Sequence, residues 1–432
     1  MLADNLPERD LNNLLRCSKH LHRLLNGYLY KVTVKNRGNN TLFWACVRGQ
    51  PKVAQRLLAL GVSAETSCEG GLRVGLHPLE TPLLSAVLYA KADCVKILLD
   101  HGVNINAQGR SKLNPLELAT KEGKIEIVRM LLKHGADISL GGAYRNFTPL
   151  HSAVFYKHGV AMLELLLDNN ADPNALDDEQ CTPLHLAPNK DIAEILIKRG
   201  ASINVANRMD QTPLSIAIKA KDKDWVAMLL RYNKHIAGAN VHHTDNQQST
   251  ALFSICLHGD QKTVRLLLDN RCNPSTRNRK GLTPVHIAAE EGWPKICKML
   301  LEAGANVNAI NYYRSTPLHR LTSIPKRRLR HLGNLERYQE TIEVLIDFGA
   351  NVNAVDRIGQ TPLMKSAYHG YWRFVDRLVK EDDVDLTIKD RRGKKASELA
   401  KDGGFESREL INLTKTRVAE MVAAAGGAAE DS

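Results

Sequence analysis

Four histidines recur in the same local sequence, and repeated histidines are the first candidates for chemistry in this chain. His151, His185, His286 and His319 each end a tetrapeptide that reads Thr-Pro-Leu-His three times and Thr-Pro-Val-His once. Histidine binds metal ions and transfers protons near neutral pH. None of the four has a second ligand at the spacing of a metal site. The pattern therefore favours a structural role for these histidines, and we expect no metal site.

Cysteine chemistry is the next possibility. The eight cysteines are scattered and include no C-x-x-C pair, and they are Cys17, Cys46, Cys68, Cys94, Cys181, Cys256, Cys272 and Cys297. Three of them, Cys46, Cys256 and Cys297, fall at apolar positions of expected helices, where a buried and unreactive thiol is the usual finding. This usage indicates reduced thiols in an intracellular protein.

Motifs for catalysis and for membrane insertion are missing from the sequence. There is no G-x-x-x-x-G-K-[ST], no H-E-x-x-H and no G-x-S-x-G. No charged-then-apolar leader opens the chain, and no apolar stretch is long enough to span a bilayer. We therefore expect a non-enzymatic chain without catalytic residues or cofactors, located in the cytoplasm, the nucleus or both.

The elements that position the histidines are helices that begin at the repeated motif. Thr accepts a hydrogen bond from a free backbone N–H at a helix start, and Pro fits the first helical position. Variants of the motif begin at Thr81, Asn114, Thr212, Thr250 and Thr361, and several neighbours are 33 or 34 residues apart. An apolar helix follows each start, as at 127–132 and 296–301. Gly135, Gly200, Gly304 and Gly349 then mark helix ends, where glycine adopts positive φ without strain.

This arrangement resembles the ankyrin repeat, a 33-residue unit of a β-turn and two helices with Thr-Pro-Leu-His at the first helix. Eleven repeats fit, the first at Asn40-Thr41-Leu42 and the last at Lys395-Ala396. The resemblance predicts an all-α ankyrin-repeat solenoid with β-hairpin loops over residues 36–415, in which each repeat contacts only its neighbours. It also implies that the motif histidines form hydrogen bonds across the joints between repeats.

Residues 1–35 have a second resemblance. Leu6-Pro7-Glu8 through Leu29-Tyr30 is similar to the latter half of an F-box, a helical module that binds a Skp-type adaptor of cullin-RING ubiquitin ligases. The opening helix of that module is absent from this chain. One interpretation is a short helical cap on the first repeat, which a solenoid end requires, and the other is surviving adaptor contact. Residues 416–432 are expected to be a disordered tail.

The ankyrin resemblance places partner contacts at the hairpin tips and on the exposed side of the first helices. Aromatic residues gather there, although the chain is only 5% aromatic, and exposed Tyr and Trp are typical of interface hot spots. The aromatic candidates are Tyr144, Phe147, Phe155 and Tyr156 in repeat four, Tyr312 and Tyr313 in repeat nine, and Tyr368 in repeat ten.

Basic residues occupy other tip positions. The net charge is +12, and residues 271–400 carry 23 Lys and Arg against 15 Asp and Glu. The basic candidates for partner binding are Arg145, Arg279, Lys280, Arg357, Arg391 and Arg392. An acidic protein partner suits this set. Nucleic acid is the weaker alternative because no nucleic-acid-binding motif accompanies the charge, and we expect a monomer.

Two local departures from the repeat pattern stand out. Pro188 falls where the first helix of repeat five should continue, so that helix is predicted to end early. Repeat nine contains an insertion at 323–334 that is expected to lengthen the loop between its helices. Its cations Lys326, Arg327, Arg328 and Arg330 have the form of a nuclear-import signal. The alternatives are an exposed, solubilising loop and an extension of the first helix.

Overall fold

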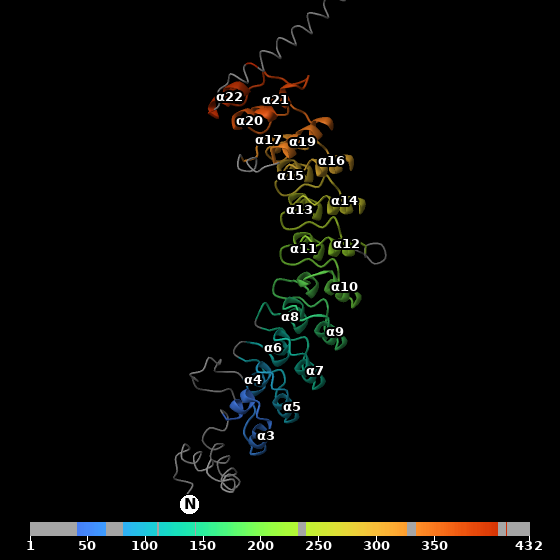
Figure 1. The fold of residues 1–432 in the computed structure, drawn as a ribbon, viewed down its shortest axis with the longest axis vertical. Coiled ribbons are helices and arrows are strands. Elements are labelled where there is room, and N and C mark those ends of the chain that lie inside the picture. Colours follow the sequence, from blue (N-terminus) through green and yellow to red (C-terminus); the bar gives the residue numbers. More distant parts are fainter. Residues whose placement is uncertain are drawn as a thin grey trace, which may run out of the picture. The chain divides into compact units, whose positions relative to one another are not determined.

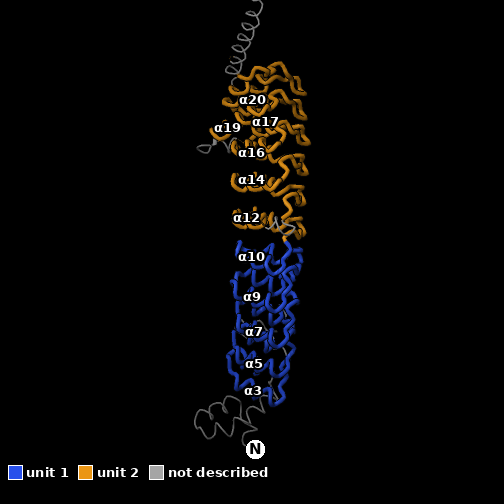
Figure 2. The backbone as a smooth tube through the Cα atoms, turned by 90° about the vertical axis from the view of Figure 1, so that its right-hand side faces the viewer, with its two compact units in different colours: residues 1–202 blue, residues 203–432 orange. Residues whose placement is uncertain are grey.

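The computed structural model describes residues 41–65, 81–109, 112–142, 144–231, 239–325, 334–404 and 412. The predicted N-terminal cap, the predicted tail and the four cations of the insertion lie outside these residues. The chain divides into two compact units, residues 1–202 and 203–432 (Figure 2), which we call unit 1 and unit 2.

Unit 1 is a stack of helix pairs, with the first helix of each repeat in an inner column and the second in an outer column (Figure 1). The inner elements after the helix at 41–48 are α4 (Pro82–Leu88), α6 (Pro115–Lys121), α8 (Pro149–Phe155) and the 3-10 turn η1 (Pro183–Leu186). The outer helices are α3 (Pro51–Ala59), α5 (Ala92–Asp100), α7 (Ile125–Lys133), α9 (Val160–Asp168) and α10 (Lys190–Lys198).

Within unit 2 the helices also form an inner and an outer column. Its inner helices are α11 (Pro213–Lys219), α13 (Ala251–His258), α15 (Pro284–Glu291), α17 (Pro317–Thr322), α20 (Pro362–His369) and α22 (Ala396–Asp402). Its outer helices are α12 (Lys223–Arg231), α14 (Gln261–Asp269), α16 (Pro294–Glu302), α19 (Asn334–Asp347) and α21 (Trp372–Val379). Across the described residues there is one isolated β-bridge, Thr244–Thr250, and no strand, so the predicted all-α class is confirmed.

The helix starts follow the capping chemistry that the sequence predicts. Thr81 Oγ1 accepts a hydrogen bond from Leu84 N at 3.2 Å, and Asn114 Oδ1 accepts one from Glu117 N at 2.8 Å. Proline occupies the start of most inner helices, where its missing N–H costs no hydrogen bond. Behind these starts, leucines such as Leu84, Leu116 and Leu150 are buried between the two columns and form a core within each unit.

Repeat five departs from the pattern as predicted. Its inner element is the four-residue turn η1 instead of a seven-residue helix such as α8. Ala187 leaves the turn with φ −56° and ψ 124°, a conformation that Pro188 favours in the residue before it. The chain then enters α10 directly, with Asn189 as its N-cap.

Repeat nine differs from expectation, because its outer helix is longer than that of repeat eight. Helix α19 has 14 residues, whereas α16 has nine. The extra turns bury Tyr338 and place the Arg337 guanidinium 4.1 Å from the Trp293 ring centre. The additional length is therefore packed against repeat eight.

Candidate protein-binding surfaces

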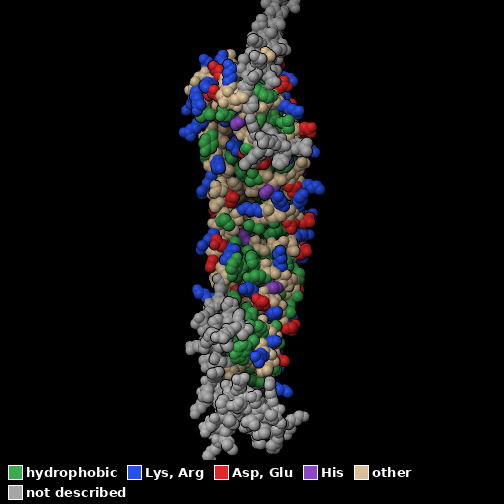
Figure 3. Space-filling view, turned by 60° about the vertical axis from the view of Figure 1, so that its left-hand side comes forward, with side chains coloured by type: hydrophobic (Ala, Val, Ile, Leu, Met, Phe, Trp, Pro, Cys, Tyr) green, Lys and Arg blue, Asp and Glu red, His purple; other side chains and the backbone are tan. Residues whose placement is uncertain are grey.

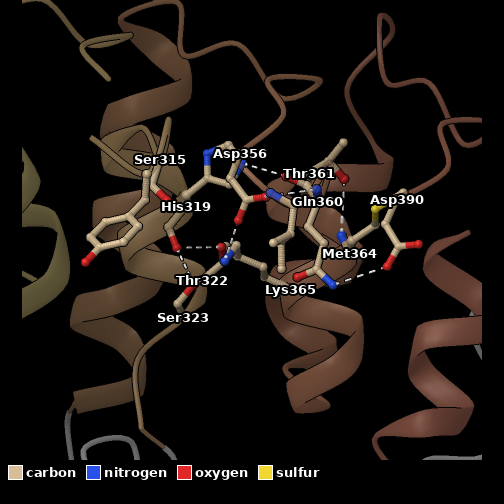
Figure 4. A network of polar contacts seen from close by, with 12 residues as sticks. Ser315, His319, Thr322, Ser323, Asp356, Gln360, Thr361, Met364, Lys365 and Asp390 are labelled. Carbon is tan, nitrogen blue, oxygen red and sulfur yellow. Dashed lines mark hydrogen bonds and ion pairs between the residues drawn. The ribbon is translucent and has the colours of Figure 1, made fainter. Parts of the chain in front are cut away.

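The joints between repeats hold the hairpins and inner helices in fixed register. In repeat nine, His319 Nδ1 accepts a hydrogen bond from the backbone N–H of Thr316 at 3.2 Å, which leaves Nε2 as the donor to Gln360 O at 3.0 Å (Figure 4). His151 and His286 make the same bonds to Cys181 O and Ser315 O. Burial lowers the pKa of His286 and His319 to about 4, so both are neutral at pH 7.

In repeats five to eleven, one Asp or Asn shapes the hairpin tip. Asp356 Oδ1 accepts hydrogen bonds from Ile358 N and Gln360 N, at 2.9 and 3.0 Å, and its Oδ2 lies 2.9 Å from Lys365 Nζ. Asn278, Asn311 and Asp390 fold their own tips with the same pair of backbone bonds. Because this residue holds the turn, the side chains beside it point outward.

Backbone hydrogen bonds also join each tip of unit 2 to the next. Tyr312 N donates to Lys280 O at 3.3 Å, Arg357 N to Tyr313 O at 2.8 Å, and Arg391 N to Ile358 O at 3.1 Å. Gly359 permits the last approach, because a Cβ there would lie 3.0 Å from Arg391 N and its φ is +78°. We call this series of bonds the tip ladder.

The aromatic candidates of repeat four form one cluster on α8 and the hairpin before it. Phe147 lies at its centre, with ring centres 5.0 Å from Tyr144 and 5.4 Å from Phe155, and Tyr156 packs against Phe155 at 5.1 Å. Tyr144 and Phe155 are 48% and 41% exposed, whereas Phe147 is completely buried. Phe147 therefore supports the exposed rings from beneath, which corrects the expectation that it contacts a partner directly.

Arg145 in the same hairpin already has an internal partner. Its Nη2 lies 2.7 Å from Asp177 Oδ2, and its guanidinium lies 5.5 Å from the Phe147 ring centre. The Asp177 side chain is fully buried, so the pair fixes the hairpin of repeat four against that of repeat five. Much of the charge of Arg145 is thus used within unit 1.

The candidates of unit 2 lie on the tip ladder, with Tyr368 on α20 the exception. Tyr312 and Tyr313 are 66% and 59% exposed, and Tyr368 is also exposed. Sequence reasoning missed Ile310 and Ile358, which are exposed at the same tips. Hydrophobic side chains lie among the charged ones on the face drawn in Figure 3.

Six tip cations of unit 2 have exposed side chains that pair with no other group in the part of the chain that the structure describes. This holds for Arg279, Lys280, Arg314, Arg357, Arg391 and Arg392. By contrast, Lys394 is paired with Asp402, and Arg277 donates to Ile310 O at 3.1 Å. The unpaired cations and the exposed rings therefore share one edge of unit 2.

The six cysteines that the structure describes are buried like apolar residues. Cys46, Cys94, Cys181, Cys256, Cys272 and Cys297 are buried and form no disulfide with one another. Burial raises the pKa of Cys272 to about 11 and raises the pKa of Cys256 and Cys297 as well. Such thiols are poor nucleophiles at neutral pH. No cluster of three metal-ligating side chains is found within the described ranges.

Comparison with known proteins identifies the family. Models of ankyrin repeats match residues 72–141, 108–177, 150–245, 233–311 and 345–400. The chain therefore belongs to the ankyrin-repeat proteins, and the predicted ankyrin-repeat solenoid is confirmed. Ankyrin repeats are generally non-catalytic modules for protein–protein interaction, and the repeats of this chain indicate such a module. None of its described helices is long and apolar enough to cross a membrane.

Three relatives that match the repeat region of this chain carry names that differ from one another. The E3 ubiquitin-protein ligase KEG of Arabidopsis thaliana is 28% identical over 297 residues, which are 65% of this chain and 16% of that protein. The mouse B-cell lymphoma 3 protein homolog is 32% identical over 147 residues, 32% of each chain. The chicken nuclear factor NF-kappa-B p105 subunit is 28% identical over 39% of this chain and 18% of its own. The chain thus spans less than a third of each of these relatives.

Proposed function

We propose that this protein recognises a client protein with its repeats and presents it to a cullin-RING ubiquitin ligase through residues 6–30. The observation that carries the recognition step is the pair Tyr312 and Tyr313, two adjacent and strongly exposed rings at a tip that Asn311 holds rigid. Rigid exposed aromatic side chains provide contact area at low entropic cost.

The client is an acidic protein segment that lies along the tip ladder of unit 2. Arg279, Lys280, Arg357, Arg391 and Arg392 stand on the tips of repeats eight, ten and eleven and have no carboxylate partner among the described residues. Unpaired cations at an interface increase the association rate with an acidic partner and suppress basic competitors.

A photocrosslinking experiment tests this surface. A benzophenone amino acid replaces Tyr312 in one variant and Lys295, an exposed residue of outer helix α16, in a matched control. We expect a protein crosslink from position 312 that an excess of acidic peptide reduces, and none from position 295. Crosslinking only to RNA would support nucleic-acid binding instead, and equal protein crosslinking from both positions would contradict a tip interface.

The ligase connection rests on the F-box-like sequence of residues 6–30 and on the resemblance to a relative named as an E3 ubiquitin ligase. Its test is a pull-down of a Skp-type adaptor by the full chain and by a chain that lacks residues 1–30, with the folding of both checked by circular dichroism. Capture by the full chain alone supports a substrate receptor.

The second candidate function is a scaffold or inhibitor whose N-terminus only caps the first repeat. Two relatives that are not named as ligases share these repeats and favour this candidate. If both chains are folded and neither captures the adaptor, the result supports the scaffold or inhibitor function.

We further propose that Lys326, Arg327, Arg328 and Arg330 direct nuclear import. Replacing all four with Ala should therefore leave a fluorescent fusion in the cytoplasm.

A further inference from the structure

A cavity of about 330 Å³ lies in unit 1, beside the shortened inner element of repeat five. Complete inner helices of this unit, such as α6 and α8, have seven residues, whereas η1 has four. The cavity is lined by the last turn of α8, the start of α9, Pro188 and the start of α10. It therefore lies beside the place that a complete inner helix of repeat five would occupy.

The floor of the cavity is apolar and fixed. Val154 and Leu163 are buried, and Ile192 of α10 is half-buried at one wall. Val160, the first residue of α9, is 42% exposed at the mouth. Binding sites for drug-sized ligands measure about 300–1,000 Å³. This cavity is at the small end of that range and suits a single large side chain.

Two charges stand at the cavity, and they are not equivalent. Asp191 lies in the first turn of α10, where the helix dipole already favours a carboxylate. Lys157 is exposed in the turn between α8 and α9, its backbone held at φ 58°, and no carboxylate among the described residues pairs with it. Both side chains are exposed, and Lys157 is the one cation among the residues that line the cavity.

We propose that this cavity binds one leucine-sized or phenylalanine-sized side chain of an extended peptide segment of a partner protein, with an acidic residue beside it that pairs with Lys157. Apolar burial in the floor supplies affinity, and the charge selects the flanking residue. This inference does not depend on the ubiquitin ligase connection, because it uses neither residues 6–30 nor the tips of unit 2.

Substitutions at the mouth can block the cavity without disturbing the core. Val160→Glu places a carboxylate at the first position of α9, where a helix tolerates negative charge. Ile125→Glu makes the same change at the first position of α7, in a repeat with a complete inner helix. Lys157→Glu reverses the flanking charge, and Lys221→Glu is its control, because Lys221 is exposed with the same φ of 58° after α11.

The experiment titrates the full chain into fluorescent nine-residue peptides with blocked ends and reads fluorescence polarisation. Their central residue is Leu, Phe or Ser, and the flanking residues are Glu or Lys. We expect saturable binding of the Leu and Phe peptides flanked by Glu, and a loss of about ten-fold or more with Val160→Glu. Lys157→Glu should shift the preference to Lys-flanked peptides, and the two control variants should bind as the natural chain does.

Several results would overturn the proposal. The Ser peptides could bind as tightly as the Leu peptides, Val160→Glu could leave binding unchanged, or no peptide could bind saturably.

Hydrogen exchange of α8 and α9 is measured on each variant to check its folding. A variant that loses protection there is replaced by Val160→Trp, which fills the mouth without adding charge, and the same criteria then apply.

Discussion

At the scale of single residues, hydrogen bonds hold the motif histidines in place. The repeated Thr-Pro-Leu-His sequence predicts a structural role for them, and the bonds of His151, His286 and His319 to the next repeat confirm it. The sequence could also predict the N-caps, because capping depends on local residue types. It could not predict the burial of Phe147, because that follows from the rings that fold over it.

Replacing His319 with Ala leaves the partly buried carbonyl of Gln360 without its donor, so we expect unit 2 to lose about 1–3 kcal/mol. The loss depends on pH. The folded pKa is about 4 and the unfolded pKa about 6.5, so the unfolded state binds more protons between these values. The natural chain is therefore fully stabilised above about pH 6.5 and loses this contribution as the pH falls toward 4. Urea denaturation of the variant should show a difference that shrinks on acidification, and His258→Ala, at an exposed position, should change little.

Glu117 occupies the histidine position of repeat three. It is buried, its Oε2 has no hydrogen-bond partner among the described residues, and burial raises its pKa to about 7. Because the unfolded pKa is about 4.3, the contribution of Glu117 is complete at low pH and is lost as the pH rises through 7. The stability advantage of Glu117→Gln over the natural chain should therefore grow as the pH rises from about 5 to about 8. An equal effect at both ends of that range, or the same gain with exposed Glu122→Gln, would contradict this reasoning.

At the scale of one element, α8 and the hairpin before it combine a buried ring, Phe147, with the exposed rings of Tyr144 and Phe155. Phe147→Ala should cost about 3–5 kcal/mol because it empties a buried ring site. Tyr144→Ala and Phe155→Ala should cost about 1 kcal/mol or less, since they remove mainly ring contacts at the surface, yet they should abolish client capture if this cluster binds the client. Thermal denaturation measures the loss of stability of each variant, and a pull-down of the crosslinked client measures its capture. Retained capture by both surface variants would remove the cluster from the interface.

The early end of the first helix in repeat five could be predicted from the sequence, but the cavity beside it and the length of α19 could not. Pro188 allowed us to predict the early end of the first helix of repeat five, because proline disfavours helical backbone in the residue before it. The cavity beside it was not predictable, since its walls come from three separate elements. The extension of α19 was missed for a similar reason, because the packing of Tyr338 and Arg337 against repeat eight is a long-range contact.

At the scale of the whole molecule, the charge of unit 2 should govern the rate of client binding. Changing Arg279, Lys280 and Arg357 to Glu should lower the association rate by about ten-fold or more at low salt and weaken its dependence on ionic strength. The control variant changes Lys262, Lys295 and Lys298, which are exposed on outer helices, to Glu and has the same net charge. Stopped-flow binding of the crosslinked client measures both. Equal slowing by the two variants would mean that net charge alone matters, and not the tips.

The sequence predicted the family, the helix pairs and most repeat boundaries of this chain. This was possible because each repeat uses similar residues to begin and end its helices. The surfaces were only partly predictable. Tyr312 and Tyr313 are exposed as their tip position suggested, whereas Arg145 forms an internal pair with Asp177, a residue 32 positions further along the chain.

The tip ladder has a consequence for how such a protein changes its partners. Its bonds use only backbone atoms of Lys280, Tyr312, Tyr313, Arg357, Ile358 and Arg391, while Asn311 and Asp356 fold the turns. The side chains of those six residues can therefore be exchanged, by mutation in nature or by design in the laboratory, without breaking a bond of the ladder. A new specificity can arise from a few codons while the architecture is inherited unchanged.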